Sequence, residues 1–102
     1  MLKEPISQPA GAPERMAGMV PGVKAGGFLF FSAIRGREPG TNQLSNDTQQ
    51  QARQAFENLR ALLSSAGGTL DDVVKVTLYL QDLRYRDGFQ YVLCDMRAEL
   101  SD

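Results

Sequence analysis

Few side chains in this sequence can move a proton or act as a nucleophile near neutral pH. The 102 residues contain no His and a single Cys, Cys94. The absence of His excludes Ser-His-Asp and Cys-His relays, His-based zinc sites and the usual proton shuttle. Any chemistry must therefore use arginines, carboxylates, hydroxyls, backbone groups or Cys94.

Four arginines follow two apolar runs: Arg35 and Arg37 come after residues 28–34, and Arg84 and Arg86 come after residues 73–80. If both runs are parallel strands, the four guanidinium groups lie beyond the same carboxyl edge, where open α/β sheets bind ligands. One interpretation is a subsite for a carboxylate, with Arg35 as the leading candidate because it is closest to Ser32. The alternative is solvated loop arginines that pair weakly with Glu38 or Asp87.

Two further side chains each allow a functional and a structural interpretation. The Ser32 hydroxyl could bind a ligand carboxylate, or it could cap the strand end through the backbone. Cys94 has no cationic neighbour within a helical turn except Arg97, so the pattern favours a buried, unreactive thiol.

Two short motifs are better explained by local structure than by ligand binding. Residues 36–42 contain glycines but lack the Lys-Ser/Thr ending of a phosphate loop, so they predict an ordinary connection. Asp71 and Asp72 are adjacent on one turn and point in different directions, which favours helix capping over a metal pair. No metal or cofactor is expected.

Strands and helices alternate in the predicted secondary structure. A short strand from Val23, a Gly26–Gly27 turn and a strong strand over 28–34 form the first part. A loop ends in three capping residues, Ser45, Asn46 and Asp47. A helix then carries one apolar stripe and stops at Gly67–Gly68. The stripe consists of Ala52, Phe56, Leu59 and Leu63.

The second half repeats this order. A capped turn at 69–72 leads into a predicted strand over 73–80, whose drier face holds Val74, Val76, Leu78 and Leu80. Asp82 can then cap a second helix with its own apolar stripe. That stripe consists of Phe89, Leu93, Met96 and Leu100.

These elements predict an α+β fold in which both helices cover one face of an open sheet. Strands 28–34 and 73–80 should run parallel through a right-handed crossover. The other sheet face has no helices to cover it, so we expect other copies of the chain to bury it. Residues 1–21 hold four prolines and predict an irregular arm with one short extended piece at most.

Composition excludes several classes of function. The net charge of -1 gives no broad footprint for nucleic acid or for an anionic membrane. The longest apolar stretch is too short to span a bilayer, and the start of the chain lacks a signal-peptide apolar region. One Cys cannot form an internal disulfide, so a cytoplasmic protein is expected.

The chain resembles the RidA family, also called YjgF or L-PSP, through residues 22–32, 51–63, 66–67 and 72–83. The resemblance implies a chorismate-mutase-like subunit with a mixed sheet. It also implies that three subunits form a barrel with a small-molecule cleft at each interface. The implied reaction is hydrolysis of reactive enamines and imines from amino acids, which gives ammonia and a 2-keto acid without a cofactor.

The resemblance and the arginine pattern assign substrate binding to five positions: Met19, Ser32, Ala33, Arg35 and Gln90. Met19 stands where active members carry a Tyr, Ser32–Ala33 replaces a Ser-Gly pair, and Gln90 replaces an Asn. The family's carboxylate-binding Arg and its water-handling Glu lie on two further strands. We expect residues 22–102 to form one domain without those strands, so no catalytic residue is assigned.

Two other functions are consistent with these residues. One is a non-catalytic trimeric member that binds small molecules or acts as a scaffold, which Met19 favours. The other is the endoribonuclease activity that some family names carry, which the absence of His and the net charge of -1 disfavour.

Overall fold

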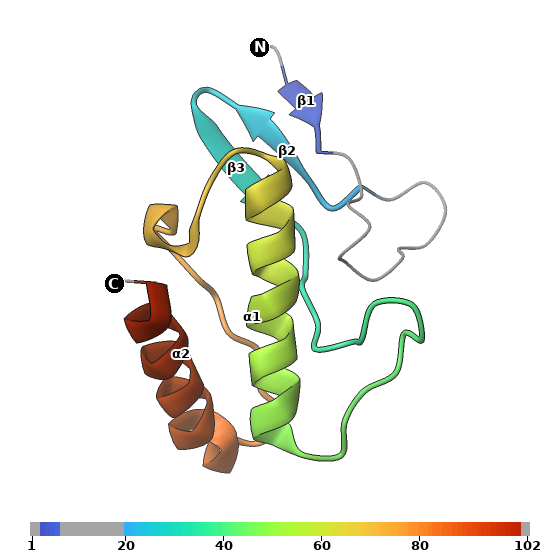
Figure 1. The fold of residues 1–102 in the computed structure, drawn as a ribbon, viewed down its shortest axis with the longest axis vertical. Coiled ribbons are helices and arrows are strands. Elements are labelled where there is room, and N and C mark those ends of the chain that lie inside the picture. Colours follow the sequence, from blue (N-terminus) through green and yellow to red (C-terminus); the bar gives the residue numbers. More distant parts are fainter. Residues whose placement is uncertain (1–2, 7–19, 101–102) are drawn as a thin grey trace.

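The computed structural model describes residues 3–6 and 20–100, which form a small antiparallel sheet and a pair of packed helices (Figure 1). The strands are β1 (Lys3–Pro5), β2 (Gly22–Ala25) and β3 (Phe28–Phe31). The helices are α1 (Thr48–Ser65), η1 (Leu70–Asp72), η2 (Leu83–Tyr85) and α2 (Arg86–Leu100). The predicted α+β class is confirmed.

A tight hairpin connects β2 and β3. Gly26 and Gly27 adopt φ values of 58° and 82°, the left-handed pair that a two-residue hairpin turn requires. β1 adds to the free edge of β2, so the order is β1-β2-β3 with antiparallel pairing throughout. The predicted hairpin is confirmed, although β3 ends at Phe31 rather than at residue 34.

The two faces of this hairpin differ in exposure. Val23 lies opposite Phe30, and Ala25 lies opposite Phe28, so these four apolar residues share one face. Phe28 and Phe30 are 59% and 57% exposed, whereas the Leu29 side chain, on the other face, is partly buried. The Phe28/Phe30 face is therefore the uncovered one.

Helix α1 begins and ends where the sequence predicts. The Asp47 carboxylate accepts the Gln49 amide at 2.9 Å, and Gly67 takes the left-handed conformation just past the helix end. Asp72 caps η1 by accepting the Thr69 amide at 2.8 Å, which confirms the capping interpretation of the Asp71–Asp72 pair.

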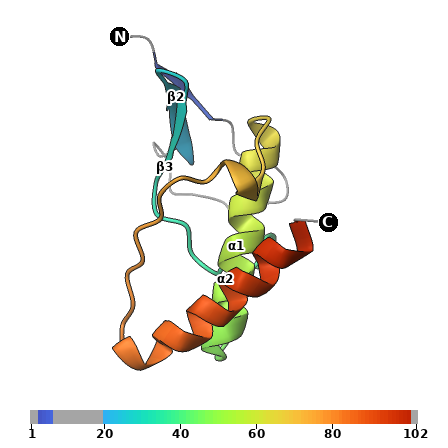
Figure 2. The same cartoon turned by 90° about the vertical axis from the view of Figure 1, so that its left-hand side faces the viewer.

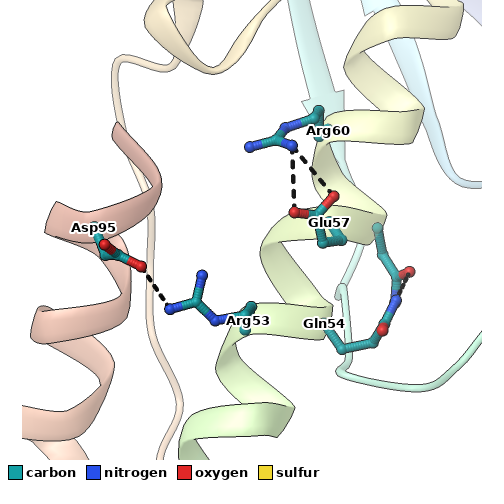
Figure 3. Close-up of polar contacts among 6 residues, drawn as sticks. Arg53, Gln54, Glu57, Arg60 and Asp95 are labelled. Carbon is teal, nitrogen blue, oxygen red and sulfur yellow. Dashed lines mark hydrogen bonds and ion pairs between the residues drawn. The ribbon is translucent and has the colours of Figure 1, made fainter. Parts of the chain in front are cut away.

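The core lies between α1 and α2. Phe56, Val92 and Met96 are buried together, and the Phe56 and Phe89 rings lie 5.2 Å apart. Across the rim of this contact, Arg53 on α1 donates to Asp95 on α2 at 2.6 Å (Figure 3). In the described part of the chain, neither helix is long and apolar enough to cross a membrane.

The predicted strand over residues 73–80 is wrong. This segment connects η1 to η2 without pairing with any strand, and it runs down the same side of the helix pair as the hairpin (Figure 2). Val74 and Tyr79 are 86% and 90% exposed. The alternating sequence favours an extended chain, but a strand also needs a neighbour for its backbone hydrogen bonds. Residues 73–80 lie beside no described strand, so the predicted parallel pairing with β3 is absent.

Candidate functional site

The polar residues after β3 are held by β2 on one side and by α1 on the other. The Ser32 amide donates to the Pro21 carbonyl at 2.9 Å, and the Ser32 hydroxyl donates to the same oxygen at 3.0 Å. Ser32 therefore fastens the end of β3 to the start of β2, as the strand-end interpretation predicts. Ser32 and Ala33 are both exposed.

The four arginines do not form one cluster, because residues 73–80 are not a strand parallel to β3. Arg37 Nη1 donates to the Asn42 carbonyl at 2.8 Å and closes the 38–43 loop. Arg84 Nη2 donates to Asp82 at 2.7 Å. The Arg84 side chain, and secondly the Arg84 amide, lower the pKa of the Asp82 carboxyl. These two arginines have structural roles.

Arg35 is the arginine best placed to meet a ligand. Its side chain is exposed, and no partner for it is found within the described part of the chain. Arg35 follows Ser32 and Ala33 after one partly buried residue, Ile34, in the segment after β3. Three of the predicted binding positions therefore lie within one short stretch of the chain.

The backbone beneath Arg35 is fixed to α1. Asn58 Nδ2 donates to the carbonyls of Arg35 and Arg37 at 2.9 and 2.8 Å. Between them Gly36 is buried, and a Cβ at that position would lie 2.1 Å from the Gln51 carbonyl oxygen. Sequence reasoning missed both residues. Asn58 could have been noticed because it is a polar residue two positions after Phe56, which places it about 200° around α1, on the opposite side from the apolar stripe.

The other predicted binding residues are not beside Arg35 in the single chain. Met19 lies outside the described residues. Gln90 is exposed on α2, whose first turn approaches Gln49 through Gly88. The segment that carries Arg35 contacts α1 through Gly36 at Gln51, and positions 49 and 51 lie about 200° apart around the helix. A ligand touching both Gln90 and Arg35 would therefore need to bridge different regions of the chain or different copies.

Cys94 corrects a prediction. It is exposed on α2 rather than buried, because one position past Leu93 rotates a helical side chain by about 100° away from the apolar stripe.

An apolar cleft of about 190 Å³ lies between residues 73–76 and the two long helices. Phe56, Leu93 and Met96 form part of its wall, and Lys75 is its charged residue. Of the predicted binding residues that the structure describes, none lines this cleft, so the cleft and the Ser32–Arg35 segment are separate features.

Comparison with known proteins identifies the family. The family model described as endoribonuclease L-PSP matches residues 10–100, which is most of the chain. The chain belongs to this family. Solved relatives in the same family carry the names RidA and YjgF, so the predicted family and its fold are both confirmed.

Individual L-PSP relatives share the match. A RutC family protein of Pyrococcus horikoshii is 40% identical over 73 residues, which cover 71% of this chain and 58% of that protein. The 2-iminobutanoate/2-iminopropanoate deaminase of Salmonella typhimurium is 35% identical over 72 residues, 71% of this chain and 56% of the enzyme. The chain thus spans little more than half the length of these curated L-PSP relatives.

The fold of this L-PSP chain also matches a ligand-bound structure. The crystal structure of Escherichia coli TdcF with bound serine superposes with a TM-score of 0.87 at 29% identity. The match covers 94% of this chain and 76% of TdcF.

Proposed function

We propose that this protein hydrolyses reactive imines and enamines derived from amino acids, releasing ammonia and a 2-keto acid. The observation that carries the proposal is the exposed Arg35 guanidinium, which no described group engages, three positions after Ser32 in a chain of the L-PSP family. The Salmonella relative is named for deamination of 2-iminobutanoate and 2-iminopropanoate, and TdcF is solved with serine. All three compounds carry a carboxylate next to a nitrogen-bearing carbon.

Arg35 and Ser32 suit such a substrate. A guanidinium pairs with both oxygens of a carboxylate in a planar, charge-assisted contact. A serine hydroxyl can both donate and accept a hydrogen bond, so in the proposed complex the Ser32 hydroxyl would bind the imine nitrogen. Together the two groups would fix the carboxylate and the nitrogen, and hold the imine carbon between them in one orientation.

The reaction itself needs only water as co-reactant. Water adds to the imine carbon, and a proton moves to nitrogen. The tetrahedral carbinolamine then loses ammonia as the carbon–nitrogen bond breaks, and the water oxygen becomes the keto oxygen. With 2-iminopropanoate the products are pyruvate and ammonia. An enamine such as 2-aminoacrylate enters the same sequence after a proton moves to its terminal carbon.

We further propose that the protein is a homotrimer with the ligand bound where copies meet. The supporting observation is the uncovered Phe28/Phe30 sheet face, together with the exposed Val74 and Tyr79. The 73–80 segment that carries these two residues runs down the same side of the helix pair as the hairpin (Figure 2). Exposed apolar surface of this kind is uncommon on a monomer. A shared cleft would also provide a second set of side chains for a ligand on Arg35.

Replacing Arg35 tests the proposed function. An amino-acid oxidase generates 2-iminopropanoate from alanine in the assay, and pyruvate and ammonia release are followed. We expect the protein to accelerate hydrolysis, and Arg35→Ala to lower kcat/KM by about tenfold to a hundredfold, the value of one charge-assisted contact. Arg86→Ala removes an exposed arginine at the start of α2 and is the matched control, with kcat/KM unchanged.

A folded wild-type protein that gives no acceleration over buffer would rule the hydrolase out. That result would support the second candidate, a non-catalytic small-molecule-binding member of the family, which the replacement of the family's Tyr by Met19 favours. A titration with serine distinguishes this candidate from a protein that binds no ligand. A binding member is expected to bind serine, and Arg35→Ala is expected to weaken that binding.

A further inference from the structure

A buried side chain supports the segment that carries Arg35. Asn58 is 2% exposed, which makes it the most deeply buried polar residue in the described part of the chain. It lies on the side of α1 that faces residues 35–37, whereas Phe56 faces α2. A buried amide must satisfy its hydrogen-bonding groups, and each group left without a partner costs about 1–3 kcal/mol.

All the hydrogen-bonding groups of the Asn58 amide are used. Its two N–H groups go to the carbonyls of Arg35 and Arg37, at 2.9 and 2.8 Å. Its oxygen accepts the Gln54 side-chain amide at 3.0 Å, a contact within α1 (Figure 3). Gln54 of α1 therefore orients the Asn58 amide through its oxygen, while the Asn58 nitrogen binds the backbone of residues 35–37.

The backbone held by Asn58 is also in direct contact with α1. Gly36, between the two bonded carbonyls, has no room for a Cβ against the Gln51 main chain. The Arg35–Gly36 peptide bond is thus packed onto the helix while the Arg35 side chain projects to the surface. A small rotation of this peptide would swing the guanidinium several ångströms, since it is the end of a long side chain.

We propose that Asn58 is a positioning residue, which holds the Arg35–Arg37 backbone on α1 and thereby sets the direction of the Arg35 side chain. That Asn58 holds the backbone of residues 35–37 does not depend on the proposed function. That Asn58 affects ligand binding rests on the proposed function, because Asn58 acts through Arg35. Asn58 itself touches no ligand.

Trypsin tests the holding of the backbone directly, because it cleaves after arginine. Asn58→Ala is expected to raise cleavage at Arg35 by about tenfold or more relative to cleavage at the exposed Arg84, since two hydrogen bonds are lost. Gln54→Ala, which removes only the contact to the Asn58 oxygen, is the control and should change the ratio little. Asn58→Asp keeps the volume without the two donors and serves if Asn58→Ala does not fold.

The ratio separates positioning from general stability. An equal rise at Arg35 and Arg84, or no rise at either, would overturn the proposal. A double-mutant cycle with serine as the probe tests the link to Arg35: Asn58→Ala weakens binding about tenfold in the wild type, but has no further effect in Arg35→Ala. Additive losses would contradict that link. A wild type without serine affinity counts against the proposed function, while the trypsin ratio still decides the role of Asn58.

Discussion

Gly36→Ala is expected to destabilise the protein by about 3 kcal/mol or more, or to prevent folding. The added methyl would lie 2.1 Å from the Gln51 carbonyl oxygen and 2.8 Å from the Gln51 Cα. These atoms belong to the backbone of α1, which cannot move aside without disturbing its own hydrogen bonds. Urea denaturation followed by circular dichroism measures the free energy of unfolding.

Gly88→Ala is the matched control for this substitution. At Gly88 the added methyl would meet the flexible Gln49 side chain, at 3.1 Å, and the position is inside a helix. Because Ala is a better helix former than Gly, we expect an unchanged or slightly raised free energy of unfolding. Equal, small effects of the two substitutions would show that residues 35–37 are not packed on α1 as described.

Phe30→Asp is expected to separate the copies of the chain. Phe30 is 57% exposed on the uncovered sheet face and in ring contact with Phe28, 6.2 Å away. A carboxylate buried in an apolar interface without a partner is costly, so the dissociation constant should rise about a hundredfold or more. Sedimentation velocity over a concentration series would show the shift to single chains.

Leu44→Asp controls for the charge itself. Leu44 is an exposed apolar residue in the 36–47 loop, where its backbone pairs with Arg37 and not with the sheet, and this variant should sediment as the wild type does. Loss of association in both variants would indicate general destabilisation, and retention in both would place the interface elsewhere.

Local sequence signals predicted the hairpin and the helices well. The Gly26–Gly27 pair requires left-handed backbone, and Asp47 and Gly67 mark the ends of α1. The positions of the apolar stripe of α1 were also predicted, although the sequence assigned this stripe to a sheet face and the structure packs it against α2 through Phe56. These features depend on neighbours within a few residues, which a sequence displays directly.

The larger failures, at residues 73–80 and at Asn58, concern partners distant in the sequence. Residues 73–80 have the alternation of a strand, but alternation does not show whether another strand is available to pair with them. The single-stripe prediction also missed that α1 is buried on a second side, where Asn58 and Leu62 lie one turn apart. Asn58 is a polar residue at a core position, and its role depends on carbonyls more than twenty residues earlier.

The predicted binding residues divide in the same way. Ser32, Ala33 and Arg35 lie within four positions of the sequence, and all three are exposed in the structure. Gln90 required the fold to place it near them, and within one chain the first turn of α2 approaches the opposite side of α1. This separation, like the exposed sheet face, is what a site shared between copies would produce.

Sedimentation equilibrium of the wild-type protein tests the central claim most directly, namely that the Phe28/Phe30 face is closed by other copies and that the Arg35 site lies where they meet. The account predicts a single species with three times the mass of the 11.2 kDa chain at micromolar concentration. A folded species that keeps the mass of one chain at the highest attainable concentration would contradict it.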